Sequence, residues 1–214
     1  PALIIPGFLS GFQKYEEMRR LLESSTLGLG PIAIAPVTIA DWVPTLLGGD
    51  FRGILDKVDG AADELLSRSK ARKIAIVGHS AGGWLARTWL GRAPYSGGKR
   101  YRGVDRCDVL LTLGTPHYSL EAYPTLALTN FRYPGAFERG VRYVSVCGAG
   151  EIGADFDLLA LLRGGAGVDG DGVTPIARAL LDGSETLVLD GVAHQPGGED
   201  DAPWYGSPGV VEKW

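Results

Sequence analysis

Short apolar runs alternate along this chain with segments in which apolar residues recur every three or four positions. The short runs end at glycine, proline or polar residues, which predicts buried strands at Ala2–Ile5, Ile32–Val37, Lys73–Val77, Asp108–Leu113, Val141–Val146 and Thr186–Leu189. The longer spacing predicts helices at Tyr15–Glu23, Phe51–Ser67, Trp84–Leu90 and Thr174–Leu181. This alternation predicts an α/β fold with a mainly parallel central sheet and helices on both faces, in a single domain over residues 1–214.

Two stretches, roughly 115–140 and 148–172, fit neither a strand nor a core helix. Loops of that length rarely persist without a function, so we expect cap or lid segments within 115–140 and 148–168. Both stretches are rich in apolar side chains, including leucines at 158, 159, 161 and 162. Such surfaces suit an acyl or prenyl chain, while ordinary core packing beneath a long loop explains them equally well.

The composition serves mainly to exclude a disordered chain, a nucleic-acid-binding protein and a membrane-spanning segment. With 45% hydrophobic and 21% charged residues, a soluble globular domain is expected rather than a disordered chain. The net charge of −4 argues against nucleic acid as a partner, and no apolar run approaches the ~20 residues that span a bilayer. The chain enters a strand directly at Pro1 without a methionine, which suggests a trimmed chain and leaves open whether a targeting segment preceded it.

The strongest chemical signal is Gly78–Gly82, which reads Gly-His-Ser-Ala-Gly and follows an expected strand and precedes an expected helix. This context predicts a nucleophile elbow, in which a sharp turn presents Ser80 above the sheet. A Cβ at Gly78 or Gly82 is expected to crowd the neighbouring chain. Ser80 is therefore the expected nucleophile.

A serine nucleophile needs a histidine base, and the chain has three histidines. His79 lies inside the elbow and is interpreted as structural. His194 lies in a loop directly after the last expected strand, where this chain order places the base. His117, which follows the fourth expected strand closely enough to line the pocket, is the rival.

The acid that orients the base should lie between the fifth strand and His194. Several aspartates satisfy this order, at 155, 157, 169, 171, 182 and 190. Asp171 is preferred because glycines flank it in a turn that opens a helix, with Asp169 as the nearest rival. The alternative interpretation is that Asp171 only caps that helix.

Two N–H donors are needed to stabilise the oxyanion of an acyl-transfer intermediate. Ala81, the residue after the nucleophile, is expected to supply one. Phe8, in the loop after the first strand, is the expected second donor, with Leu9 next in order. An ordinary strand-to-helix turn is the alternative for that loop.

These segments together resemble the lipase-like α/β-hydrolases. The resemblance rests on Pro6–Phe8, Gly78–Gly83, Leu113–His117 and Gly170–Pro175, in that order, and it covers nearly the whole chain. The tail Pro203–Pro208 is similar to plant, algal and cyanobacterial members related to the GPI inositol-deacylases. One departure is Pro6, which stands where many lipases have a histidine.

The resemblance implies the α/β-hydrolase fold, with Ser80 as nucleophile, Asp171 as acid and His194 as base. It also implies that the N–H groups of Phe8 and Ala81 form the oxyanion hole, and it is compatible with a plastid location. The expected substrate is a small-molecule or lipid ester, and a transient membrane-surface contact is the additional partner expected. Pocket positions are expected at Leu9, His117, Tyr118, Leu158 and Leu162.

The expected function is therefore a serine hydrolase that cleaves a lipophilic carboxylic ester. An acyl-thioesterase with the same triad and a catalytically silent member that binds a lipid or a protein are the alternatives. Cys107 and Cys147 are expected at opposite ends of parallel strands, too far apart for a disulfide, which requires Cα atoms within about 7 Å. The scattered histidines and cysteines lack ligand spacing, so neither a metal nor another cofactor is expected.

Overall fold

The computed structural model describes residues 1–24, 30–46, 48–119, 124–153, 168–196 and 202–214, with the backbone alone for 151–153. Its main sheet has six parallel strands: β1 (Ala2–Ile5), β2 (Ile32–Ile34), β3 (Ile74–His79), β4 (Cys107–Leu113), β5 (Arg142–Ala149) and β8 (Glu185–Asp190). The strand order is β2-β1-β3-β4-β5-β8. Two short strands, β6 (Glu151–Gly153) and β7 (Val168–Gly170), form a separate antiparallel pair. The predicted mainly parallel sheet is confirmed.

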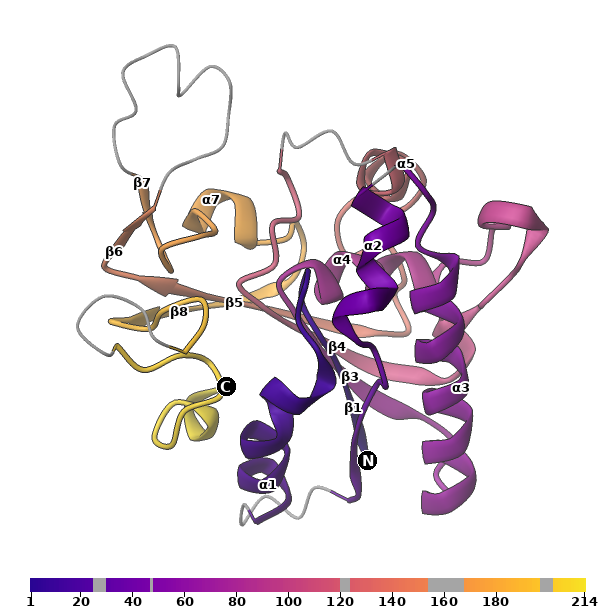
Figure 1. Ribbon diagram of the computed structural model, residues 1–214, viewed down its shortest axis with the longest axis horizontal. Helices are drawn as coiled ribbons and strands as arrows, with labels where there is room; N and C mark the ends of the chain where they lie inside the picture. Colours follow the sequence, from indigo (N-terminus) through magenta and orange to yellow (C-terminus); the bar gives the residue numbers. More distant parts are fainter. Residues whose placement is uncertain (25–29, 47, 120–123, 154–167, 197–201) are drawn as a thin grey trace.

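The alternation of side chains along each strand builds a core on either face of the sheet. On β1, Leu3 and Ile5 belong to one buried cluster, while Ala2 and Ile4 belong to the other. Helices α3 and α4 cover the first face, and α1 with the C-terminal segment covers the second (Figure 1). Because both faces are covered at the centre of the sheet, β1 is apolar and buried along its whole length, whereas the edge strand β8 carries polar residues and is largely exposed.

The helices follow the predicted positions with shifted ends. The structure contains η1 (Phe12–Tyr15), α1 (Glu16–Ser24), α2 (Ile39–Leu46), α3 (Arg52–Ser69), α4 (Ala81–Leu90), η2 (Ser96–Gly98), η3 (Gly103–Asp105), α5 (Pro124–Arg132), α7 (Ile176–Ala179) and η5 (Val211–Lys213). None of the described helices is both long enough and apolar enough to cross a bilayer.

Two helices, α2 and α5, were not predicted. Pro44 and three exposed apolar residues make the α2 segment look unlike an amphipathic helix in the sequence. The start of α2 nevertheless has a recognisable capping pattern. Asp41 accepts hydrogen bonds from the backbone N–H of Thr38 at 2.7 Å and from its hydroxyl at 2.8 Å, a capping arrangement three residues apart. Helix α5 lies within the stretch 115–140, and the lid function of that stretch stays a prediction.

Parallel strands bring their following loops to one edge of the sheet, and this edge carries the site. The segments after β1, β3, β4 and β8 all leave the sheet there, and α2, α5 and α7 lie at the same end of the molecule (Figure 1). Cys107 begins β4 and Cys147 lies near the end of β5. Both are buried and free, as expected.

Candidate active site

Ser80 occupies the turn between β3 and α4. Its φ of +51° and ψ of −128° form a conformation that residues with a side chain rarely adopt. A Cβ on Gly78 would lie 2.5 Å from the Cα of Gly83, and one on Gly82 would strike the carbonyl oxygen of Ile5. The predicted crowding at both glycines is confirmed, and the tight turn leaves Ser80 facing a cavity.

Asp171 and His194, 23 residues apart in the chain, meet in a buried pair. The Nδ1 of His194 lies 2.7 Å from Oδ2 of Asp171, and the two residues are 6% and 1% exposed. A backbone hydrogen bond from the His194 N–H to the Asp171 carbonyl, 2.7 Å long, fixes the two loops together. Since the carboxylate only accepts, Nδ1 carries the proton and Nε2 keeps its lone pair.

The other carboxylate oxygen of Asp171, Oδ1, stabilises the turn in which this residue lies. Oδ1 accepts hydrogen bonds from the N–H groups of Val173 at 3.1 Å and Thr174 at 2.7 Å. Helix α7 begins only at Ile176, with Pro175 at its N-cap position, so Asp171 does not cap that helix. Each carboxylate oxygen therefore has separate partners, and the turn sets the direction of Oδ2.

Tyr205 is a member of this network that the sequence did not single out. Its hydroxyl donates to Oδ2 of Asp171 at 2.6 Å and accepts from the N–H of Gly148 at 2.8 Å. Burial and the negative charge of Asp171 raise the pKa of Tyr205 well above its ordinary value, so the hydroxyl stays protonated. The tail that contains Tyr205 stood out only through the family resemblance.

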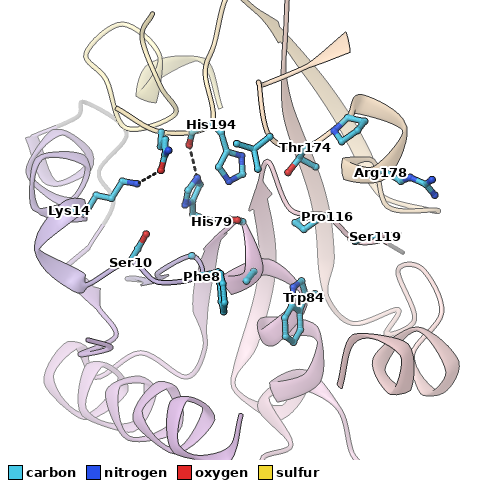
Figure 2. Close-up of a pocket in the computed structure, with 16 residues that line it drawn as sticks. Phe8, Ser10, Lys14, His79, Trp84, Pro116, Ser119, Thr174, Arg178 and His194 are labelled. Atoms are coloured by element: carbon cyan, nitrogen blue, oxygen red, sulfur yellow. Dashed lines mark hydrogen bonds between the residues drawn. The ribbon is translucent and has the colours of Figure 1, made fainter. Parts of the chain in front are cut away.

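His79 joins three loops without facing a carboxylate. Its Nε2 lies 2.9 Å from the carbonyl oxygen of His194 (Figure 2). Its Nδ1 lies 2.7 Å from the hydroxyl of Tyr15. A carbonyl can only accept, so Nε2 carries the proton and Nδ1 accepts from Tyr15. The Tyr15 oxygen in turn accepts from the N–H of Gly7 at 2.9 Å. This chain links the loop after β1, the elbow and the loop that bears His194.

The surroundings of His79 keep it neutral. Burial holds the pKa of His79 well below its ordinary value, and the nearby charges of His194 and Lys14 act in the same direction. Burial also raises the pKa of Tyr15 to about 12, so this hydroxyl remains a donor. These contacts agree with the structural interpretation of His79 made from the sequence.

A cavity of about 290 Å³ lies over the elbow. Its lining residues come from segments far apart in the sequence (Figure 2): Gly7, Phe8, Ser10, Lys14, His79, Ser80, Ala81, Trp84, Pro116, Ser119, Val173, Thr174, Pro175, Arg178, His194 and Gln195. Ser80 and His194 thus share one cavity, although no hydrogen bond joins the serine hydroxyl to the histidine in the structure. In ligand-free enzymes this contact is often long and tightens only when substrate binds.

Phe8, in the loop after β1, and Ala81, within the elbow, line the same cavity. Ala81 is the first residue of α4, so its N–H has no acceptor within the helix. A Cβ on Gly7 would lie 2.8 Å from that of Ser80, which shows how closely the loop after β1 approaches the serine. The phenyl ring of Phe8 stands edge-on to Trp42 with ring centres 5.3 Å apart, an anchor for the loop.

Three of the five pocket positions expected from the sequence do not line the cavity. Leu9 is 41% exposed, has a φ of +51° and is not among the lining residues. The hydroxyl of Tyr118 accepts from the N–H of Asp182, so its ring is drawn towards the loop before β8. His117 is fully buried and is not among the lining residues. The other two positions, 158 and 162, lie outside the described residues.

The ring nitrogens of His117 face a guanidinium and a hydroxyl, and neither of them faces a carboxylate. Its Nδ1 lies 3.3 Å from a guanidinium nitrogen of Arg87, and its Nε2 lies 3.2 Å from the hydroxyl of Thr112. Burial and the positive charge of Arg87 hold the pKa of His117 well below its ordinary value. Because Arg87 also donates to Asn130 and to the carbonyl of Tyr133, this group ties α4 to α5.

No candidate metal centre is present in the part of the chain that the structure describes. Within those residues, no three His, Cys, Asp or Glu side chains lie close enough together to hold an ion. The histidines have other partners: His79 faces Tyr15, His117 faces Arg87, and only His194 faces a carboxylate.

No protein-family model matches the chain, and no curated protein matches it either. Among solved structures, the product of the gene lin2722 from Listeria innocua is similar at a TM-score of 0.52 and 17% identity, over 100% of this chain and 91% of the other. The phospholipase PlaB from Legionella pneumophila is similar at a TM-score of 0.57 and 14% identity. That match covers 94% of this chain and 54% of PlaB, so the chain spans about half of its length. With its parallel six-stranded sheet and these structural neighbours, the chain has the α/β-hydrolase fold.

Proposed function

We propose that the protein is a serine hydrolase that cleaves carboxylic esters with a lipophilic acyl group. Ser80 is the nucleophile, His194 the base and Asp171 the acid. The observation that carries this proposal is the buried pair of Asp171 and His194, 2.7 Å apart, beside the cavity that Ser80 also lines. A carboxylate on Nδ1 leaves Nε2 free as a base and stabilises the imidazolium that forms.

In the first half of the reaction, the hydroxyl oxygen of Ser80 attacks the ester carbonyl while Nε2 of His194 accepts its proton. The carbonyl oxygen becomes an oxyanion, which the N–H groups of Phe8 and Ala81 stabilise. The bond to the alcohol oxygen then breaks, and His194 returns its proton to the departing alcohol. The acyl group remains bound to Ser80.

In the second half, a water molecule replaces the alcohol. His194 removes a proton from this water as it attacks the acyl carbon, and a second oxyanion forms in the same position. Collapse of that intermediate releases the carboxylic acid and returns the proton to Ser80. Asp171 orients His194 throughout and is itself held in place by hydrogen bonds from its two turn N–H groups and from Tyr205.

The apolar part of the cavity suits an acyl group of limited length. Trp84, Pro116, Val173 and Pro175 supply apolar surface next to the elbow. The volume of about 290 Å³ lies at the lower end of the roughly 300–1,000 Å³ typical of small-molecule sites. Esters with short and medium acyl chains are therefore expected to fit better than palmitate.

The test combines an active-site probe with a chain-length series. A fluorophosphonate should label the native protein and fail to label Ser80→Ala, whereas absence of labelling would indicate a catalytically silent member. With p-nitrophenyl esters, butyrate and octanoate should be hydrolysed faster than acetate or palmitate. Activity confined to acetate would contradict a lipophilic acyl group, and a matched thioester measured beside butyrate separates the two carbonyl classes.

We also propose a transient contact with a lipid surface around the cavity mouth. Ile39, Val43 and Leu46 recur every three or four positions along α2 and are 49–58% exposed. Leu9 is exposed next to Phe8, and Val173 is exposed on the cavity wall itself. Sedimentation with phosphatidylcholine vesicles should retain the native protein better than the variant Val43→Ser, and equal retention would contradict the contact.

A further inference from the structure

The cavity carries positive charge without a balancing carboxylate of its own. Lys14 and Arg178 line it, and none of the described lining residues is acidic. The chain as a whole has a net charge of −4, so this local excess is not a reflection of the overall composition. Asp171 is 1% exposed, shielded behind His194, and already accepts four hydrogen bonds.

Lys14 is the better placed of the two cations. It belongs to η1, directly before Tyr15, and its side chain extends towards His79 and the loop that bears His194 (Figure 2). Its Nζ donates to Oε1 of Gln195 at 3.2 Å and lies 5.7 Å from the ring centre of Trp204. Both partners are neutral, and within the described residues Lys14 forms no salt bridge.

This environment is unusual for a lysine. Surface lysines normally extend into water, whereas Lys14 is partly buried against an aromatic ring. Partial burial lowers the pKa of Lys14, and its charge is felt at His79 beside the reaction centre. An ammonium held this close to neutral partners retains donors for an anionic ligand.

The position of Lys14 also indicates which half of the ester it meets. In the proposed reaction His194 returns its proton to the departing alcohol, so the alcohol must lie on the His194 side of the cavity. The ammonium of Lys14 donates a hydrogen bond to the side chain of Gln195, the residue after His194. The apolar Trp84 and Pro116 lie on the other side of His79, away from Lys14 (Figure 2).

We propose that Lys14 is a specificity-determining residue that binds an anionic group, a phosphate or a carboxylate, on the alcohol part of the ester. This inference rests on the proposed function, because it names the substrate class of the same site. The ammonium binds the anion while the apolar side of the cavity holds the acyl group. Charge-assisted hydrogen bonds of this kind change binding by about 10- to 100-fold.

The test compares butanoyl esters that differ only in the charge of the alcohol. The neutral ester is 1-butanoylglycerol, the phosphate-bearing ester is 1-butanoylglycerol 3-phosphate, and the carboxylate-bearing ester is the butanoyl ester of glyceric acid. The native protein should prefer at least one anionic ester over the neutral ester by about 10-fold or more in kcat/KM. Whichever ester is preferred identifies the anion.

Three variants show whether Lys14 causes the preference. Lys14→Met keeps the alkyl stem and should lower the ratio of anionic to neutral kcat/KM to near 1, while Lys14→Arg should retain most of it. Lys70→Met removes the same charge from the exposed C-terminal end of α3 and should leave the ratio unchanged. Near-ultraviolet circular dichroism of each variant reports whether it is folded.

The possible failures are distinguishable. If the native protein hydrolyses neutral esters without preferring either anionic ester, the inference about Lys14 is overturned and the hydrolase proposal stands. An unchanged ratio in Lys14→Met, or an equal fall for neutral and anionic esters, also overturns it. If no ester is hydrolysed and the fluorophosphonate does not label Ser80, the proposed function itself fails.

Discussion

The regions around His194 and His117 contain the same buried residue type in opposite electrical settings. Each histidine lies in the segment that follows a sheet strand, β8 for His194 and β4 for His117. The Nδ1 of His194 faces the carboxylate of Asp171, whereas the Nδ1 of His117 faces the guanidinium of Arg87. His194 lines the cavity and His117 does not.

The difference shows how a partner decides what a histidine can do. A carboxylate only accepts, so the proton of His194 sits on Nδ1 and the lone pair of Nε2 remains available. A guanidinium only donates, so Nδ1 of His117 provides the lone pair and its Nε2 proton bonds to Thr112. Burial and the positive charge of Arg87 hold the pKa of His117 below its ordinary value, so this ring stays neutral.

Replacing each histidine in turn is the most direct test of the different roles assigned to them. His194→Ala removes the proposed base and should lower kcat for p-nitrophenyl butyrate by about 10⁶-fold, the size seen when a triad histidine is lost. His117→Gln should keep kcat within about threefold, because it touches neither the cavity nor the reacting atoms. A larger loss in His117→Gln than in His194→Ala would reverse the assignment.

Asp171→Asn tests whether the charge beside His194 matters. The amide preserves the size of the side chain and an oxygen for the N–H groups of Val173 and Thr174, but it cannot hold the imidazolium. We expect kcat to fall by about 10⁴-fold, since the tautomer of His194 changes. A melting temperature close to that of the native protein is the control, and full activity would remove Asp171 from the triad.

Tyr205→Phe should have a smaller effect on the same region. It deletes one hydrogen bond to Asp171 and leaves the N–H of Gly148 without its acceptor. We expect kcat to fall by about tenfold, equivalent to about 1.4 kcal/mol. Tyr143→Phe is a matched control, because that buried hydroxyl has no hydrogen-bond partner. Equal losses in the two variants would show that Tyr205 contributes only packing.

The pH dependence of the free energy of unfolding tests whether His117 resists protonation in the folded protein. Its pKa in the folded protein is well below the value of about 6.5 expected in the unfolded chain. The unfolded chain therefore binds more protons below that pH, and the free energy of unfolding falls as pH decreases. Each such histidine contributes a slope of about 1.4 kcal/mol per pH unit.

Chemical denaturation between about pH 6.5 and 5 measures this slope. His117→Gln should reduce it by the contribution of one proton, while the remaining slope comes from His79, whose pKa is lowered in the same way. Identical slopes in the native protein and His117→Gln would show that His117 does not resist protonation. Carboxylates titrate mostly below this range and contribute little to it.

The sequence was most informative where the local pattern suffices. All six strands of the main sheet lie within a few residues of their predicted positions, because apolar runs that end at glycine or proline have few other solutions. The turn that carries Asp171 was also predictable from local sequence, because Gly172 adopts a φ of +89°, a conformation that favours glycine. Helix α2 was missed because Pro44 lies within it and three of its apolar residues, Ile39, Val43 and Leu46, are exposed.

The cavity was the least predictable feature. Leu9, His117 and Tyr118 follow strands that end at the edge of the sheet that carries the site, yet none of the three lines the cavity. A position after a strand fixes the neighbourhood of a residue but not the direction of its side chain, which depends on whichever partner it meets. Lys14 and Tyr205 approach the site from helix and tail segments whose local patterns contain no sign of it.

The amino-acid order alone determined the alternation of strands and helices and the glycine turn that exposes Ser80, because these depend on interactions between near neighbours. The positions that only the folded chain sets are the carboxylate beside His194, the guanidinium beside His117 and the lysine that lines the cavity. Those outcomes depend on which distant charges are brought together in a buried space, where a single opposite or like charge sets the protonation of its neighbour.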